Sequence, residues 1–413
     1  MSALSAFLDI AIAPPNPERK LLAAFTKDTH SSKVHLGRRE HLNEDGQCSV
    51  LPLVLKIRLQ AAGDPTLTSD YMPTLGFPEF TRSVMELALG RDSPAIIENR
   101  AAGIQTVGGT GAVRLGAELL KRCYNVGVAW CGPVYLSSPC DDSLARTFQA
   151  VGIRDVHHYR YWDAEKKSVA VEWLLEDLEA VPEQAVIVLS ASGHCPTGAD
   201  PSQEQWASIA QVMMKRRLFP FFLLPAQGLC SGDPARDAWP LRHFVSLGLE
   251  LLCAQSFSHN FRLYGERVGS LLLVLKQSAT LLALQSQAED LVRTLWSHPP
   301  GGGARVVTTV LNNPAHLAEW RDVVKTMVER GMLVRERLRE KLRVLGTPGS
   351  WDHLTQQGGM YCYTGLTAKQ VAFLANKRHI YLPGNGSLNI SALNSRNLDY
   401  VAESIHLAMT SNP

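Results

Sequence analysis

Short runs of apolar residues recur along the first two thirds of the chain and alternate with segments of helical length. Most positions are apolar in five such runs, which span residues 133–137, 185–191, 219–224, 249–256 and 269–275. Strands that are apolar on both faces are typical of a parallel sheet that helices cover on each side. Amphipathic segments at 111–123 and 202–217 precede two of these runs and are predicted to be helices. The alternation predicts an α/β fold with a doubly wound, mostly parallel sheet.

The pattern changes after residue 312. Residues 316–345 form one long, charge-rich helical pattern, which we expect Gly331 to interrupt. Towards the C-terminus the pattern predicts two further helices, at 368–376 and 398–409, and two short strands, at 380–382 and 388–391. We therefore expect a second, smaller α+β domain after the large α/β domain.

The length of 413 residues suggests more than one domain, since a domain holds roughly 150 residues. We expect three segments along the chain. They are an N-terminal arm with part of the small domain, the large domain, and the small C-terminal domain, over residues 1–49, 50–325 and 326–413.

The charged residues are almost balanced, because 41 Lys and Arg against 39 Asp and Glu give a net charge of +2. Proteins that bind nucleic acid usually carry a basic excess, so we expect no nucleic-acid partner. The most apolar stretches, 218–224 and 270–275, are much shorter than the roughly 20 residues of a membrane-spanning helix. Residues 1–20 lack the pattern of a secretion signal or an organelle-targeting peptide. We therefore expect no membrane partner and a cytoplasmic location.

The spacing of cysteine and histidine residues does not indicate a metal site. The eight cysteines are scattered without a C-x-x-C pair, and the histidines show no paired metal-ligand spacing. We therefore predict that the chain holds no metal.

A glycine-rich turn, Thr106-Val-Gly-Gly-Thr-Gly, precedes the first predicted helix. Backbone N–H groups in such a turn, the Thr110 hydroxyl and the positive end of the helix can together stabilise a phosphate. The same kind of turn also occurs without a ligand, as a plain connection between a strand and a helix. Ser256, Ser258 and Arg267 follow a predicted strand and would complete an anion site at the carboxyl end of the sheet.

A series of motifs spread over nearly the whole chain carries a resemblance to a known family. The motifs are Tyr71-Met-Pro, Asp92-Ser-Pro-Ala, Gly108-Gly-Thr-Gly, Tyr159-Arg-Tyr-Trp-Asp-Ala-Glu-Lys, Arg236-Asp-Ala-Trp, Cys253-Ala-Gln-Ser-Phe-Ser, Tyr264-x-Glu-Arg-Val-Gly and Lys377-Arg-His-Ile-Tyr. In these motifs and their order the chain resembles the aspartate aminotransferases, and within them the cytosolic type. Members of this family are pyridoxal-phosphate enzymes of fold type I. The resemblance implies a fold type I architecture, a homodimer and a site for pyridoxal phosphate.

The resemblance implies that the phosphate-binding half of the site is kept. In the family the phosphate is held by six positions, which in this chain are Gly109, Thr110, Ser256, Ser258, Arg267 and Tyr71. Tyr71 would be contributed by the partner subunit. Arg293 matches the arginine that receives the distal carboxylate of a dicarboxylic substrate across the dimer.

The same resemblance implies that the chemical half of the site is changed. The lysine that joins the cofactor falls on His259, whose imidazole has no primary amine with which to condense with an aldehyde. The aspartate that keeps the pyridine nitrogen protonated falls on Leu223, so the ring would lose its electron-withdrawing charge. Four further family positions are changed. The tyrosine that hydrogen-bonds the ring falls on Ala226, and the asparagine of the cofactor pocket falls on Cys195. The tryptophan that stacks on the ring falls on Asp141, and the arginine for the α-carboxylate falls on Ser387.

Near the N-terminus, Arg38-Arg39 takes the place of an apolar–glycine pair that closes over the substrate in the family. Two interpretations of Arg39 stay open. It either supplies a substitute for the cation missing at Ser387 or fills space that a substrate once used.

The resemblance and its departures together predict a catalytically degenerate homologue that keeps its dimer and a pocket for a small dicarboxylate or a phosphate-bearing ligand. Pyridoxal phosphate would then bind weakly and without a covalent link. One alternative is an active aspartate:2-oxoglutarate aminotransferase, or a related racemase of acidic amino acids. A further hypothesis is a heterodimer with an active paralogue, to which this chain would lend Tyr71 and Arg293.

Overall fold

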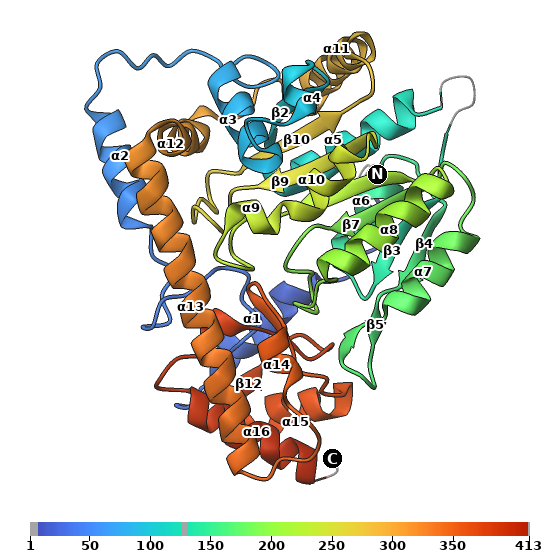
Figure 1. Cartoon of the computed structure of the whole chain (residues 1–413). Helices are drawn as coiled ribbons and strands as arrows, with labels where there is room; N and C mark the ends of the chain where they lie inside the picture. The colour runs from blue at the N-terminus through green and yellow to red at the C-terminus, as the bar shows by residue number, and fades with distance from the viewer. Residues whose placement is uncertain (1–6, 126–129, 412–413) are drawn as a thin grey trace, which may run out of the picture.

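A seven-stranded sheet forms the centre of the computed structural model, which describes residues 7–125 and 130–411 (Figure 1). The strand order across the sheet is β2 (Ala101–Val107), β10 (Val268–Val274), β9 (Leu251–Ser256), β8 (Phe219–Leu224), β7 (Val186–Ser190), β3 (Val134–Ser138) and β4 (Val156–Arg160). Strand β10 pairs antiparallel with both of its neighbours, and the other pairings of this sheet are parallel. The predicted α/β fold with a mostly parallel sheet is confirmed.

Helices cover both faces of this sheet because its central strands are apolar on both sides. Val186 and Val188 of β7 belong to the core beneath α5 (Gly108–Cys123), α6 (Asp142–Ala150) and α11 (Ser278–Leu295). Ile187 and Leu189 belong to the opposite core, beneath α7 (Val171–Ala180), α8 (Gln203–Lys215) and α10 (Trp239–Ser246). Successive side chains of a strand point to opposite faces, so an uninterrupted apolar run supplies both cores.

A long helix, α13 (Pro314–Val344), connects the sheet region with a second layered region (Figure 1). Its first half packs with α2 (Pro52–Ala62), α3 (Pro78–Leu89) and α12 (Gly301–Asn312). Its second half contributes Val334, Leu338 and Leu342 to a separate apolar core. That core also contains Leu36 and Leu42 from the N-terminal part of the chain.

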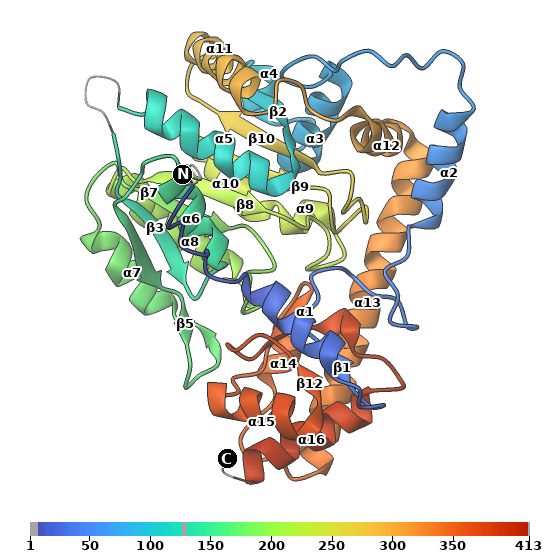
Figure 2. The same ribbon diagram turned by 180° about the vertical axis from the view of Figure 1, so that it is seen from behind.

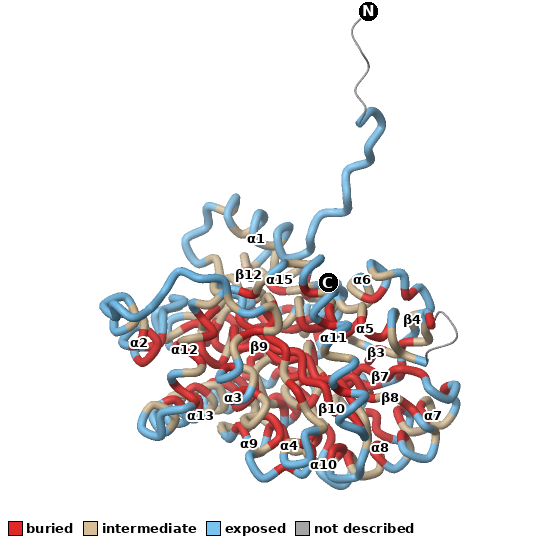
Figure 3. Tube along the Cα trace, turned by 90° about the horizontal axis from the view of Figure 1, so that it is seen from above, coloured by how far each residue is buried: buried red, intermediate tan, exposed pale blue. Residues whose placement is uncertain are grey.

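The elements around this second core are short. They are α14 (His353–Gln356), β11 (Tyr361–Tyr363), α15 (Ala368–Arg378), β12 (Ile380–Tyr381), β13 (Ser387–Asn389), a 3-10 turn (Ile390–Ala392) and α16 (Leu398–Thr410). Strands β11 and β13 pair antiparallel, and β12 pairs parallel with β1 (Val34–His35). Helix α1 (Pro17–Lys27) lies beside β1 (Figure 2), and the segment before α1 projects from the body of the molecule (Figure 3).

The remaining elements connect these layers. They are α4 (Pro94–Ile97), α9 (Pro234–Asp237) and the hairpin strands β5 (Trp162–Asp163) and β6 (Ser168–Val169).

The expected interruption at Gly331 is wrong, because α13 continues through this residue. A glycine inside a helix costs about 1 kcal/mol relative to alanine. Burial of Trp320 and Val324 on one side of Gly331, and of Val334 and Leu338 on the other, outweighs that cost.

Candidate functional site

A cavity of about 380 Å³ lies at the carboxyl ends of the parallel strands, the usual position of a ligand in an open α/β sheet. The strand ends contribute Ser137, Ser190, Leu223 and Ser256 to its lining. Most of the sequence-predicted site residues lie here, namely Arg39, Gly109, Thr110, Asp141, Cys195, Leu223, Ala226, Ser256, Ser258, His259 and Arg267. The fold thus brings together residues from six distant stretches of the chain.

One end of the cavity is suited to an anion. Arg267 lies against the first residues of α5, and a Cβ at Gly108 would come within 2.5 Å of its Nη2. The Ser256 hydroxyl lies 3.2 Å from that of Ser258. Arg267 forms no ion pair with any residue that the structure describes, and its recorded hydrogen bond is a long one, 3.4 Å from Nη1 to the Tyr264 carbonyl. A free guanidinium, two hydroxyls and a helix N-terminus together offer several donors to a phosphate.

His259 follows these serines and is held as a neutral ring. The Tyr264 hydroxyl oxygen accepts the His41 backbone N–H at 2.8 Å and lies 3.4 Å from His259 Nδ1. Burial, followed by the charges of Arg39 and Arg267, lowers the pKa of His259 to about 4. The imidazole is therefore uncharged at neutral pH.

Leu223, Ala226 and Ala254 form an apolar part of the cavity lining beside the ends of β8 and β9. Leu223 is the β8 residue whose register partner on β9 is Ala254, and both line the cavity together with Ala226. These side chains carry no hydrogen-bonding group. These three side chains would therefore offer a ring only apolar contacts.

Arg39 and Asp141 close one side of the cavity as an ion pair. Arg39 Nη2 lies 2.8 Å from Asp141 Oδ2, and Arg39 Nε lies 2.5 Å from Glu18 Oε1 of α1. Burial would raise the pKa of the Asp141 carboxyl, but the Arg39 charge and the Ser143 N–H outweigh it, and the pKa lies below its usual value. The guanidinium is therefore committed to two carboxylates of this chain, which leaves it little capacity to act as a substrate clamp.

Cys195 lies beside a histidine network that sequence reasoning did not place in the site. His194 stacks on Tyr161 at 3.8 Å, and its ring nitrogens lie 2.8 Å from the hydroxyls of Ser137 and Thr197. Burial lowers the pKa of His194 to about 3 and raises that of the Cys195 thiol to about 12. The ring is a satisfied structural group, and the thiol stays protonated.

Two cavity residues, Ser137 and Tyr264, were also missed as site residues. Tyr264 could have been found from its position between Ser258 and Arg267 in the sequence. Ser137 carries no such signal, because its contribution depends on how β3 ends beside β7.

Three predicted residues do not line this cavity. Ser387 is buried in β13, and its hydroxyl donates to Asn385 Oδ1 at 2.8 Å. Arg293 is exposed near the end of α11. Tyr71 is 85% exposed and stacks on His298, with 4.8 Å between ring centroids.

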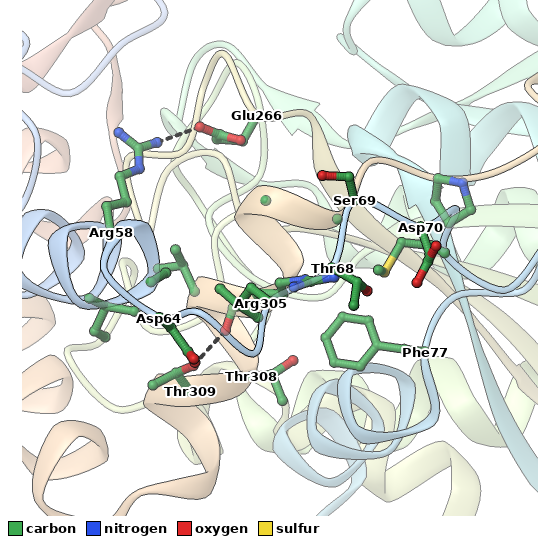
Figure 4. Close-up of a pocket in the computed structure, with 18 of the residues that line it drawn as sticks. Arg58, Asp64, Thr68, Ser69, Asp70, Phe77, Glu266, Arg305, Thr308 and Thr309 are labelled. Atoms are coloured by element: carbon green, nitrogen blue, oxygen red, sulfur yellow. Dashed lines mark hydrogen bonds and ion pairs between the residues drawn. The ribbon is translucent and has the colours of Figure 1, made fainter.

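Tyr71 instead lines a separate cavity of about 1170 Å³ between α2 and α12. Figure 4 shows this second cavity, where Arg58 pairs with Glu266 at 2.7 Å and Arg305 lies near Thr309. A role for Tyr71 or Arg293 at the first cavity would therefore need a second subunit.

The described residues include no cluster of three or more His, Cys, Asp or Glu side chains arranged to hold a metal ion. In the same part of the chain, no helix is long and apolar enough to cross a membrane.

The comparisons with known proteins agree with the fold and with the motifs. The family profile "Aminotransferase class I and II" matches residues 31–405. "Aspartate aminotransferase, cytoplasmic" of Gallus gallus is 48% identical over 408 residues, and "Putative aspartate aminotransferase, cytoplasmic 2" of Mus musculus is 40% identical over 410 residues. Each alignment covers 99% of both chains.

The solved structures support the same assignment. An aromatic-amino-acid aminotransferase from Burkholderia pseudomallei, covalently bound to pyridoxal phosphate, is 34% identical and superposes with a TM-score of 0.94 over 98% of this chain and all of the other. The structural neighbours of this chain are fold type I aminotransferases, so the predicted fold type is confirmed. The chain belongs to the class I and II aminotransferases, as a homologue of the aspartate aminotransferases.

Proposed function

We propose that this chain is a catalytically degenerate aspartate aminotransferase homologue that binds a phosphate-bearing small molecule without a covalent link. One observation carries the proposal. His259 takes the position of the cofactor lysine in the resemblance, and no lysine is among the described residues that line the cavity. An aldehyde cofactor would find no primary amine with which to condense. Transamination is therefore expected to be absent or very slow.

Pyridoxal phosphate fits one part of the cavity and not the other. Arg267, Ser256, Ser258 and the start of α5 offer donors to its phosphate. When bound in an active enzyme, this cofactor supplies an electron-withdrawing ring. The Leu223 side of this cavity offers that ring no ionised or hydrogen-bonding partner. The residues support attachment through the phosphate alone, and no reaction step through the cofactor follows from them.

The chain's own residues would then act by binding and by excluding water. Arg267 would neutralise the phosphate, and neutral His259 would add a donor beside it. The Arg39–Asp141 pair would shield the bound molecule on one side. These are the parts of a binding site.

We also propose a homodimer and a cytoplasmic location. The exposure of Tyr71 and Arg293, and their absence from the lining of the first cavity, support roles at the partner's site. A heterodimer with an active paralogue would use the same two residues. The word cytoplasmic in the names of the chicken and mouse relatives supports the location.

The test of the proposed function uses the full-length protein incubated with pyridoxal phosphate, dialysed, reduced with borohydride and analysed by peptide mass spectrometry. We expect no trapped cofactor and an aspartate:2-oxoglutarate turnover at background. The variant His259→Lys is the matched control, because it places one amine in the cavity and should be trapped at residue 259. A wild-type adduct on any lysine, together with brisk turnover, would establish an active aminotransferase instead. Interconversion of L- and D-aspartate would favour the racemase.

A further inference from the structure

Part of the cavity lining is a continuation of the apolar core. Adjacent strands contribute Leu136 of β3, Val188 of β7, Leu223 of β8 and Ala254 of β9, and α5 contributes Val113. All five belong to or pack against the core on the α5 face of the sheet. A ligand that fills the cavity would therefore lie against aliphatic side chains from four neighbouring strands.

The charges in the lining leave nothing to balance a cationic ligand group. The charged side chains among the described lining residues are Arg39, Glu40, Asp141 and Arg267. Asp141 is bound by Arg39 and by the Ser143 N–H, and Glu40 lies 3.4 Å from Arg38 Nε. Both carboxylates thus already have cationic partners. Burying a further positive charge without its own counterion is costly.

The imidazoles in the lining respond to the same environment. His259 and His194 both have pKa values well below the ordinary value, and burial is the largest cause for each. A pyridinium ring would face the same low polarity and, beside His259, the positive charges of Arg39 and Arg267. The cavity therefore disfavours a cation at the ring position while it favours an anion at Arg267.

From these two properties we infer that the natural ligand class is the phosphate monoester of an uncharged, largely apolar ring. The inference rests on the proposed phosphate site. A volume of about 380 Å³ is within the usual range for a small-molecule site. The phosphate would be held by Arg267, Ser256 and Ser258, and the ring would pack on Leu223 and its neighbours.

Two probes of nearly equal size separate the ring charge from the phosphate. Benzyl phosphate carries a neutral ring, and (1-methylpyridinium-3-yl)methyl phosphate carries a permanent positive charge on a ring of the same shape. Titration calorimetry on the full-length protein at pH 7.5 would compare both with inorganic phosphate. We expect benzyl phosphate to bind at least tenfold tighter than either of the others. Equal or tighter binding of the cationic ester would overturn the inference.

The variants Arg267→Gln and Leu223→Asp distinguish a failure of the phosphate site from a failure of the neutral-ring inference. If the cationic ester wins and Arg267→Gln weakens it, the phosphate site stands and only the neutral-ring inference fails. If none of the three probes binds the wild-type protein, the phosphate site fails and the inference fails with it. Leu223→Asp should raise the affinity for the cationic ester at least tenfold, whereas its isosteric control Leu223→Asn should not. The wild-type preference decides the question even where a Leu223 variant fails to fold.

Discussion

The ion pair between Arg39 and Asp141 connects two parts of the chain that are 102 residues apart in sequence. Arg39 lies in the segment after α1, and Asp141 is the N-cap of α6 in the sheet region. We predict that this pair holds the N-terminal segment against the cavity. Replacement of Arg39 by glutamine removes the charge and keeps a side chain of comparable length.

The size of the effect follows from the distance and the exposure of the two groups. Their atoms are 2.8 Å apart, and the side chains of Arg39 and Asp141 are 53% and 25% exposed. Two unit charges at 4 Å attract by about 1 kcal/mol in water, and by more where solvent is partly excluded. The entropy lost in fixing an exposed arginine offsets part of that gain. We therefore expect a coupling free energy of about 0.5–1 kcal/mol between the two residues.

A double-mutant cycle measures this coupling. The free energy of unfolding in urea is compared for the wild-type protein, Arg39→Gln, Asp141→Asn and the double variant, at 0.15 M and at 1 M salt. The coupling should shrink at the higher salt concentration, because the pair is only partly shielded from solvent. As a second readout, peptide mass spectrometry follows the alkylation of Cys195, which lines the same cavity and should react faster in Arg39→Gln.

The neighbouring residue Arg38 provides the matched control. Among the residues that the structure describes, its guanidinium forms an ion pair with Glu40 alone, two residues away, at 3.4 Å. Arg38→Gln should leave both the Asp141 coupling and the alkylation rate unchanged. A coupling of less than about 0.2 kcal/mol, the lower limit for exposed pairs, with an unchanged alkylation rate in Arg39→Gln, would refute a closing role for Arg39.

Three further predictions concern the cavity itself. Arg267→Gln should weaken the binding of inorganic phosphate by roughly 10–100-fold in a thermal-shift titration, because a hydrogen bond to a charged group contributes about 1.5–3 kcal/mol. The control variant Arg305→Gln, in the second cavity, should leave phosphate binding unchanged. The pKa of His259 is about 4 when folded, so the unfolded chain binds more protons between pH 6.5 and pH 4. The free energy of unfolding should therefore fall as the pH is lowered from 6.5 to 4. In His259→Gln this dependence of the free energy on pH, measured by urea unfolding, should be shallower by up to about 1.4 kcal/mol per pH unit. Gly108→Ala should lower the free energy of unfolding by about 1–2 kcal/mol, because φ is +67° there and the new methyl group would meet Arg267; a neutral result in urea unfolding would contradict the close approach.

Hydrophobic patterning was sufficient for the central strands and insufficient for the edge strands. β8 and β9 are apolar at nearly every position, and the predicted runs overlap them closely. β4 at the edge has the sequence VHHYR and is largely exposed, so it has no apolar run to detect. β2 is also a strand at the edge, and it contains Gly103, where a Cβ would come 2.8 Å from the Thr81 carbonyl of α3. Close packing of that helix, which no local pattern reveals, determines the β2 sequence.

Most of the residues expected at the site line one cavity, whereas the ion pair between two of them could not be foreseen from the sequence. Gly109, Ser256 and His259 could be placed from motifs and resemblance, and they line one cavity. The two interpretations of Arg39 could not be separated, because the partner that engages it, Asp141, is remote in sequence. The resemblance presented Asp141 as the loss of a stacking tryptophan, and nothing in it shows that the new carboxylate meets a new arginine.

The pairing of Arg39 with Asp141 supports the proposed preference of the cavity for anions. A carboxylate introduced at position 141 alone would repel a phosphate and would lie partly buried without a counterion. Arg39 cancels that charge locally, and Glu18 in turn satisfies the rest of the guanidinium. Among the charged lining residues that the structure describes, Arg267 alone has no ion-pair partner. The electrostatic potential near Arg267 is therefore expected to be positive, although two arginines and two carboxylates line the cavity. A ligand gains most when its negative charge lies at Arg267 and its remaining surface is uncharged.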